Sequence, residues 1–225
     1  MNTRFGAAIM VGCLSLAGHS WAQQPQHGLT QTQHLPVMGQ ITLQSPKRTI
    51  SVFSLGEVTS SPGESLPEFL KRAGGKMSAW SAQTGFEACA NICKNAKGRL
   101  GLSVTTNQSH VVCVIVDHCP KGFEALTVRE TVHTHPKQKS TTYTVSVTDK
   151  KFLLGERKLG EKVPFGDAEE FSPEDVSGVS GYLITGEGKL RYWSDATGII
   201  DYGLVTNGGQ GVFGPGSKAT TQHPW

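Results

Sequence analysis

The sequence has no long apolar stretch beyond its first 22 residues. Within them, Arg4 is the only charge before an apolar run over residues 5–18, and Ser20-Trp21-Ala22 follows with small residues suited to cleavage. This run is too short to span a membrane, and the pattern is typical of a secretory signal peptide. The alternative is a buried N-terminal helix. We therefore expect residues 1–22 to be removed and the mature protein to be periplasmic or secreted, without a membrane span.

Clusters of lysine and arginine are also absent. The formal net charge is only +3, and no basic stripe interleaved with aromatic residues stands out. Nucleic-acid-binding surfaces carry such clusters, so we expect no nucleic-acid partner. No internal repeat is visible, and 225 residues of which 37% are hydrophobic suffice for one well-packed domain plus tails, but not for two.

Cysteine is scarce, and the first of the five would leave with the signal peptide. The remaining four are Cys89, Cys93, Cys113 and Cys119. An even number in an oxidising compartment predicts two disulfides. If residues 87–93 form a strand, Cys89 and Cys93 lie about 13 Å apart, too far to bridge each other. Each then pairs with Cys113 or Cys119, in either combination. A four-thiolate zinc site is the alternative, but these cysteine spacings fit it poorly.

Three regions differ in composition. Residues 23–45 are rich in glutamine and predict a flexible segment, residues 46–202 carry the domain, and residues 203–225 form a loose Gly-rich tail. Within the domain, apolar or alternating runs predict strands. These runs are 49–55, 86–93, 111–117, 126–135 and 141–147, followed by a hairpin over 182–193. Residues 150–164 are polar and predict a hairpin or loop.

Helices are expected at three places. Ser65 has the features of an N-cap, with Pro67 and Glu68 in the first turn. This helix is expected to end near Gly74-Gly75, before a second helical stretch to Trp80, and a short helix should open at Ser172. The mixture predicts a single α/β or α+β domain, with a mixed β-sheet flanked by helices.

The stretch HTHP at 133–136 is the most informative motif in the chain. If it is a strand, His133 and His135 point to the same face. Neutral imidazoles are good zinc ligands. Two imidazoles and one carboxylate form a three-ligand set that leaves a fourth position for water, as in catalytic zinc sites. The alternative is a pair of exposed histidines at a sheet edge.

The stretch SPED at 172–175 could supply that carboxylate. Ser172 as N-cap, proline at the first helical position and Asp175 at the third form a good helix start, which is a sufficient explanation by itself. The two interpretations are compatible, because an acid in the first turn can also bind a metal. Ser172 could then direct its hydroxyl at a developing oxyanion.

A metal hydrolase also needs a general base. Glu87 is the candidate, because a carboxylate flanked by apolar strand residues is partly desolvated and its pKa rises towards a useful value. The alternative is a solvent-facing glutamate on a strand edge. Glu124 and Glu130 are the rival candidates.

Together these motifs resemble the JAB/MPN (JAMM) metallopeptidase family. That family has a Glu-x-Cys-Gly-like segment, then His-x-His-Pro, then Ser-x-x-Asp. Residues 87–90 (EACA), 133–136 (HTHP) and 172–175 (SPED) match this order. The stretches FSPED at 171–175 and YLITGEG at 182–188 are similar to a group of bacterial JAB-like domains of unknown function.

The resemblance implies a zinc hydrolase in which His133, His135 and Asp175 bind Zn²⁺. Glu87 would take a proton from water activated by the metal and later protonate the leaving amine. Ser172 would stabilise the tetrahedral oxyanion. Zinc would lower the pKa of the water and polarise the scissile carbonyl.

The chain departs from the family pattern in two ways. Thirty-five residues, 137–171, separate the HTHP motif from Ser172, where the family has a short connection. We expect this insertion to fold as an extra β-hairpin or lid near the site. Because of this insertion, Asp167 is an alternative to Asp175 as the third metal ligand. In addition, Ala90 stands where the family more often has glycine.

Three functions are compatible with these motifs. Export of a JAB-like hydrolase predicts a peptidase or amidase whose substrate is an exported protein or a cell-wall peptide, such as a peptidoglycan stem peptide. The second is a non-catalytic JAB-like binding module. The third is a disulfide-stapled structural protein of a cell-envelope assembly, with the tails as docking segments. All the candidate ligands and the base are present, and this completeness favours the hydrolase.

Overall fold

The computed structural model describes residues 35–44, 47–126, 130–137, 142–153, 157–177 and 180–207. The expected signal peptide, residues 1–22, lies outside these ranges, as do residues 23–34 of the expected flexible segment and most of the expected tail. Among the described residues, no helix is both long and apolar enough to cross a membrane.

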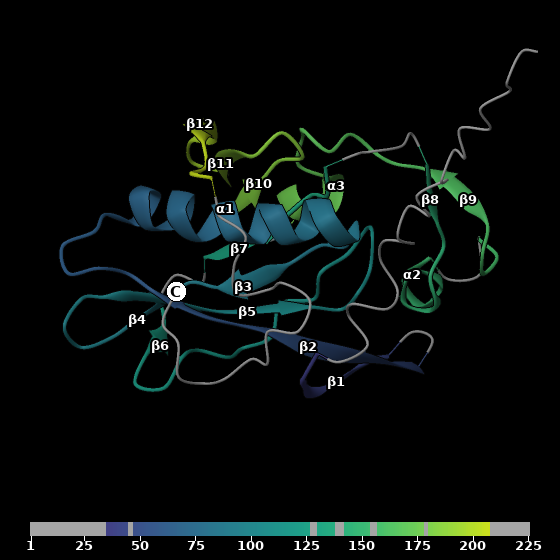
Figure 1. Cartoon of the computed structure of the whole chain (residues 1–225), viewed down its shortest axis with the longest axis horizontal. Helices are drawn as coiled ribbons and strands as arrows, with labels where there is room; N and C mark the ends of the chain where they lie inside the picture. The colour runs from purple at the N-terminus through teal and green to yellow at the C-terminus, as the bar shows by residue number, and fades with distance from the viewer. Residues whose placement is uncertain are drawn as a thin grey trace, which may run out of the picture.

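A ten-stranded mixed sheet is the centre of the fold (Figure 1). Its main path is β1-β2-β5-β3-β7-β10-β11-β12, and β4 and β6 extend it beside β5. Among the described strands only β7 and β10 pair in parallel. The strands of the path, in chain order, are β1 (Val37–Gln44), β2 (Lys47–Thr59), β3 (Cys89–Asn91), β5 (Leu100–Thr106), β7 (Thr131–Thr134), β10 (Gly181–Ile184), β11 (Lys189–Ser194) and β12 (Gly198–Leu204). The two short additions are β4 (Cys93–Lys94) and β6 (Glu124–Ala125).

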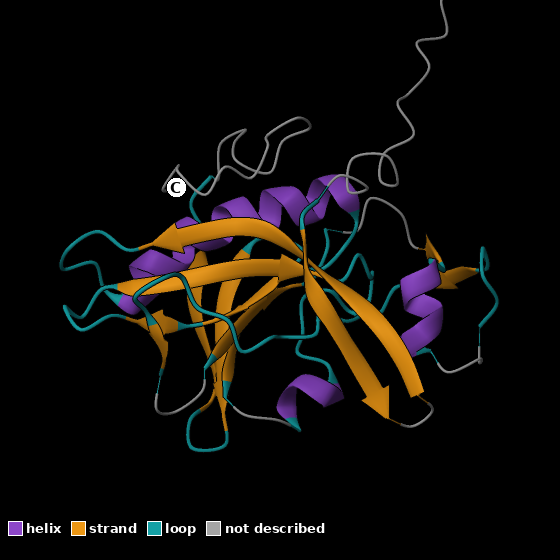
Figure 2. Cartoon of the chain, turned by 90° about the horizontal axis from the view of Figure 1, so that it is seen from below, coloured by secondary structure: helices purple, strands orange, loops and turns teal. Residues whose placement is uncertain are grey.

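The long helix α1, Leu66–Thr84, covers one face of this sheet. In Figure 2 it lies behind the strands along most of its length. Its buried apolar side chains are Phe69, Leu70, Ala73, Met77 and Trp80, and they join the core formed by β2, β5, β7 and β10. A mixed sheet with a helix packed on it confirms the expected α/β class of a single domain.

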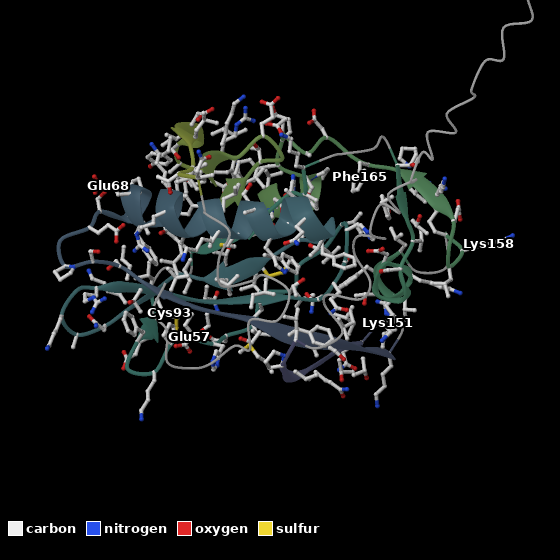
Figure 3. The ribbon with its side chains drawn as sticks, in the orientation of Figure 1. Glu57, Glu68, Cys93, Lys151, Lys158 and Phe165 are labelled. Atoms are coloured by element: carbon white, nitrogen blue, oxygen red, sulfur yellow. A yellow bond between two sulfur atoms is a disulfide. The ribbon has the colours of Figure 1, made fainter. Side chains whose placement is uncertain are left out.

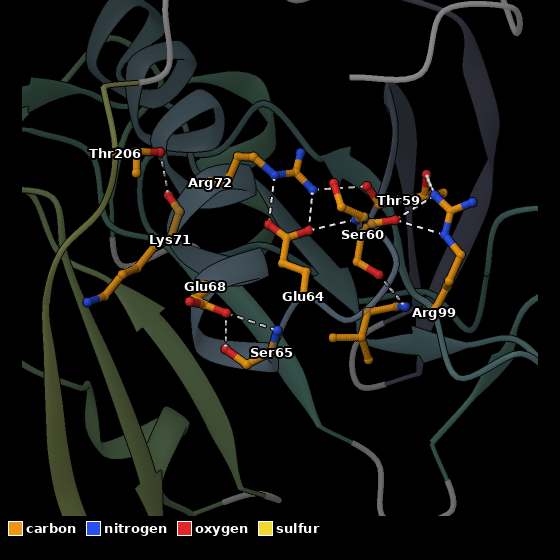
Figure 4. Close-up of polar contacts among 11 residues, drawn as sticks. Thr59, Ser60, Glu64, Ser65, Glu68, Lys71, Arg72, Arg99 and Thr206 are labelled. Carbon is orange, nitrogen blue, oxygen red and sulfur yellow. Dashed lines mark hydrogen bonds and ion pairs between the residues drawn. The ribbon is translucent and has the colours of Figure 1, made fainter.

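The start of α1 follows the sequence prediction. The backbone N–H and the hydroxyl of Ser65 both donate to the Glu68 carboxylate, at 3.1 and 2.6 Å. Arg72 pairs with Glu64 at 2.8 Å and also donates to the Thr59 carbonyl, which ties the helix to the end of β2 (Figure 4). These polar contacts fix where the chain leaves the sheet and enters the helix.

The expected end of the helix near Gly74-Gly75 is wrong, since α1 continues to Thr84 and ends at Gly85 with φ of +80°. The reason is packing rather than propensity. A Cβ added at Gly74 would lie 2.8 Å from Ile184 Cδ1 and 3.2 Å from Val205 Cγ1. Glycine therefore lets the helix approach β10 closely, and the contact outweighs its unfavourable helix propensity.

Gly74→Leu should lower the free energy of unfolding by about 1–3 kcal/mol, because overpacking a filled core costs more than the propensity gain of about 1 kcal/mol returns. Urea unfolding followed by circular dichroism measures this change. Gly39→Ala is the control, because a Cβ at that position has no atom within 4 Å. Unchanged or increased stability of Gly74→Leu would contradict the packing argument.

Residues 137–171 separate the HTHP motif from Ser172, and their described strands and helix form a small unit at one end of the sheet (Figures 1 and 2). We call it the insertion. Its strands β8 (Thr142–Thr144) and β9 (Lys162–Pro164) pair antiparallel, and α2 (Val147–Phe152) lies between them in sequence. Figure 3 shows Lys158 pointing away from the body of the molecule. The expected strand over 141–147 is thus limited to β8, because Ser146 begins a helix.

Other expected boundaries need correction. The segment 23–45 was expected to be flexible, yet 37–44 is strand β1, which pairs with β2. The expected tail from residue 203 includes the last two residues of β12. The expected strand over residues 111–117 is wrong, since these residues form no strand of the sheet. Other bonds hold this segment, including Val114 N–H to the Asn107 side chain at 2.6 Å.

The two disulfides join Cys89 to Cys113 and Cys93 to Cys119. The prediction that Cys89 and Cys93 do not bridge each other is confirmed, and the structure selects one of the two remaining pairings. Both disulfides hold the segment 107–119 against β3 and β4. Two disulfides fit an extracellular protein.

Candidate metal centre

The two histidines of the HTHP motif lie where strand β7 ends. In register, His133 stands between Cys89 of β3 and Leu183 of β10. His135 follows the strand, and its backbone N–H donates to the Ile184 carbonyl at 2.9 Å. The extended backbone therefore continues through both residues and places both rings on one face, with centroids 5.2 Å apart. Both side chains are 12% exposed.

The predicted carboxylate meets these rings. Asp175 belongs to the short helix α3, Pro173–Val176. Its Oδ1 lies 3.3 Å from His133 Nε2, and its Oδ2 lies 3.7 Å from His135 Nε2. The same residue also closes the helix start, since Ser172 N–H donates to Oδ2 at 2.8 Å and Asp175 N–H donates to Ser172 Oγ at 3.2 Å. The capping role and the position beside the histidines therefore coexist.

These three side chains could hold a metal ion. The ligand atoms of His133, His135 and Asp175 all lie within 4.8 Å of one another. At a tetrahedral zinc with bonds of 2.0–2.2 Å, neighbouring ligand atoms stand about 3.4 Å apart, close to the two nitrogen–oxygen distances above. His133 Nε2 is buried, and its one polar neighbour among the described residues, Asp175 Oδ1 at 3.3 Å, does not meet it with full hydrogen-bond geometry. A buried nitrogen without a full hydrogen bond is costly, and a metal bond would satisfy it.

Electrostatics favour the ionised form of Asp175. Burial acts to raise the pKa of this carboxyl, but hydrogen bonds and charge interactions with His133 and His135 outweigh it and hold the pKa well below its usual range. The Ser172 N–H adds to the lowering. A carboxylate that stays ionised is the form that a metal binds.

Glu87 lies two residues before the start of β3 and is almost fully buried, with 6% of the residue exposed. Burial raises the pKa of the Glu87 carboxyl to about 8, opposed in part by His135 and supported by Asp175 and Asp149. A carboxyl with its pKa near neutrality can both accept and donate a proton. Among the candidates for a base, Glu87 shares a cavity with the histidines, whereas Glu124 and Glu130 do not line it.

Four hydroxyl and carbonyl groups fix the backbone around Glu87. Ser109 O accepts from Glu87 N–H at 2.9 Å, and Thr106 Oγ1 donates to Glu87 O at 2.7 Å. The hydroxyl of Ser81 in α1 donates to Phe86 O and lies 2.7 Å from Thr134 Oγ1, which accepts from Ala88 N–H at 2.9 Å. Since Thr134 separates the two histidines, the same bonds fix Glu87 relative to His133 and His135.

A cavity of about 790 Å³ opens at this cluster. Among its lining residues are Glu87, His133, His135, Ser172 and Asp175, so all five predicted site residues meet in one place. Asp167, the possible substitute for Asp175, instead lines a smaller cavity of about 350 Å³ that adjoins Glu87 and His135. Its carboxylate accepts from Glu169 N–H at 2.9 Å.

No family model, curated protein or solved structure matches this chain. The resemblance to JAB/MPN metallopeptidases therefore rests on the motifs and on the chemistry of the residues that they bring together. The fold by itself supports only the broader description, a domain with a large mixed sheet and helices.

One feature beside the site was not predicted. Asp149, fully buried in α2, accepts from His110 Nδ1 at 2.7 Å, from His110 N–H at 2.8 Å and from Ser109 Oγ at 2.7 Å. The available signal was the spacing Ser146-x-x-Asp149, which repeats that of Ser172 and Asp175. In both places the capping aspartate also faces histidine. The pair attaches the insertion to the segment that follows β5.

Proposed function

We propose that the protein is an exported zinc-dependent hydrolase of the JAB/MPN type, a peptidase or amidase acting on cell-wall or exported peptides. One observation carries this proposal: His133, His135 and Asp175 converge within ligand distance in a cavity that also contains the buried carboxyl of Glu87. Two imidazoles, one carboxylate and a nearby base form the residue set that metal-assisted hydrolysis requires.

In this mechanism the chain's own residues position the ion and move protons. His133 and His135 would hold zinc through Nε2, and Asp175 through its carboxylate. When bound, zinc supplies Lewis-acid chemistry, lowering the pKa of water and polarising a carbonyl group. Glu87 would accept a proton on its carboxylate and return it to the leaving amine. The Ser172 hydroxyl, which accepts from Asp175 N–H, retains its own proton to donate to an oxyanion.

The charge of the cavity supports an amide substrate over a phosphate ester. Among the described residues that line it, none is lysine or arginine, whereas Glu87, Asp117 and Asp175 are acids. Sites that cleave phosphate esters surround the anionic substrate with cationic groups. A neutral peptide bond needs no cationic side chain to offset its charge. We therefore place the substrate among amides.

Metal content tests the proposal directly. The mature protein, residues 23–225, purified with zinc supplied and then dialysed, should retain about one zinc per chain, measured by atomic emission. The double variant His133→Ala/His135→Ala should retain none, because two of three ligands are lost. His118→Ala, which changes an exposed histidine outside the cluster, is the control and should bind as the wild type does. Absence of zinc from the wild type would favour the non-catalytic binding module.

A further inference from the structure

The cavity beside the metal centre has a largely apolar wall that the proposed chemistry does not use. It comes from three short segments: residues 111–115 on both sides of Cys113, the end of α2, and the residue before Ser172. The apolar side chains that line the cavity are Val111, Val112, Ile115, Phe152, Leu153 and Phe171. All six are partly exposed rather than buried in the core. Apolar groups beside a reacting centre are typical of a subsite that receives a substrate side chain.

The first part of this wall is rigidly held. Cys113 is bound to Cys89 of β3, two residues after Glu87, and Cys119 is bound to Cys93 of β4. Between them, Val114 N–H donates to Asn107 Oδ1 at 2.6 Å, and Asn91 Nδ2 donates to Val116 O at 2.7 Å. The wall is therefore preformed, and a ligand would not have to spend binding energy on ordering it.

The second part of the wall comes from the insertion, through Phe152 and Leu153. Asp149 in the same helix is fixed by the bonds to His110 and Ser109 described above. Two more bonds join α2 to β2: Lys151 Nζ donates to Thr49 O at 2.6 Å, and Arg48 donates to Lys151 O at 2.5 Å. The insertion is thus attached on two sides, and its apolar end borders the cavity.

Charge restricts what can occupy this space. The ionisable side chains that line it are acids and histidines, without a lysine or arginine among the described lining residues. An acidic side chain placed against the wall would lose its hydration and find no lysine or arginine among the described lining residues as a partner. An apolar side chain would bury the partly exposed valine, isoleucine and phenylalanine surfaces of the wall.

We propose that this wall is the specificity subsite of the enzyme, and that it selects peptides with a large apolar side chain next to the scissile amide. The inference rests on the proposed function for the position of the scissile bond. The expected ligand is a peptide segment, because one cavity extends from the apolar wall to His133, His135 and Asp175. Val112 and Ile115 are the determining residues on the disulfide-held side.

Binding of two short peptides tests the subsite. The probes are fluorescein-labelled, acetylated pentaglycines whose central residue is leucine in one and aspartate in the other. The titrations use the Glu87→Gln protein loaded with zinc, so that the peptides are not cleaved during the measurement. Binding is followed by fluorescence anisotropy, and the same titration is repeated on the metal-free protein. Burial of one leucine side chain should give the leucine peptide an affinity about 10- to 30-fold higher.

A charged substitution in the wall should remove this preference. In the Glu87→Gln background, Val112→Asp places a carboxylate where the leucine side chain would lie, and the ratio should fall to about 1. Val147→Asp is the matched control, since it makes the same change of residue type at a valine that is 62% exposed and does not line the cavity. It should keep the preference of the parent. Circular dichroism checks that each variant is folded.

The outcomes separate the subsite from the chemistry. A leucine preference that is lost in Val112→Asp supports the subsite. If the wild-type protein hydrolyses neither peptide, that result contradicts only the proposed function. Equal affinity for the two peptides, binding of neither, or a preference that survives Val112→Asp would overturn the subsite whatever the metal content.

Discussion

Glu87→Gln is expected to slow hydrolysis by about 10²- to 10⁴-fold, the usual contribution of a positioned general base. Glutamine has nearly the same shape and can take the same place before β3, but it cannot accept a proton. Zinc content should stay near that of the wild type, because Glu87 is not among the three clustered ligands. The measurement is the initial rate of peptide cleavage at saturating zinc, with metal content determined on the same samples.

Glu57→Gln provides the control, since Glu57 is exposed on β2, away from the cavity (Figure 3). It should cleave at the wild-type rate. A Glu87→Gln protein that also cleaves at the wild-type rate would exclude Glu87 as the base. Loss of both activity and zinc would instead assign Glu87 to the metal site.

The stability of metal-free protein gives a second measure of the Glu87 environment. Burial raises the pKa of Glu87 from 4.5 to about 8, so the folded state binds a proton that the unfolded state has released between these values. The contribution of this group to the free energy of unfolding is therefore complete below about pH 4.5 and is lost as the pH rises through 8. Glu87→Gln should remove this part of the pH dependence.

Asp149→Ala should lower the free energy of unfolding by about 3–5 kcal/mol, as expected when one partner of a buried ion pair is removed. The change leaves His110 Nδ1, His110 N–H and Ser109 Oγ without their acceptor in a buried site. It also removes the acceptor of Ser146 N–H at the start of α2. Urea unfolding measures the loss, and hydrogen exchange over residues 142–165 shows whether the insertion opens first.

The acid dependence of Asp149 has the opposite sign from that of Glu87. Burial acts to raise the pKa of Asp149, but the hydrogen bond and charge of His110 and the bonds from Ser109 and Ser146 outweigh it and lower the pKa from 3.8 to about 2. The stabilisation is therefore present above about pH 4 and is lost as the pH falls towards 2. Asp195→Ala, at an exposed position, is the control. Equal acid sensitivity of Asp149→Ala and wild type would contradict this assignment.

The candidate site was predictable from sequence because each of its parts is set by local structure. Strand geometry puts His133 and His135 on one face, and helix-start geometry puts Asp175 beside Ser172. Short motifs of this kind depend on backbone geometry over two to four residues. The sequence motifs indicated that these parts belong together, although their separation is long.

The unpredicted features depend on contacts between distant segments. Strand β1 (VMGQITLQ) ends a segment rich in glutamine and is a strand because β2 supplies its hydrogen bonds. Helix α1 continues through Gly74 because β10 packs closely there. His110 and Asp149 are 39 residues apart, and neither neighbourhood signals the other. Tertiary contacts of this kind override local propensity.

Because β7 and β10 pair in parallel, the length of the insertion between them has little effect on the positions of His133, His135 and Asp175. Two parallel neighbours require a crossover, and here His135 stands at its beginning and Asp175 near its end. The ends are fixed independently of what lies between, by His135 N–H to Ile184 O and by Asp175 against the histidines. Doubling a loop costs only about 0.6 kcal/mol in closure entropy. The crossover can therefore change in length or sequence without displacing His133, His135 and Asp175 from one another.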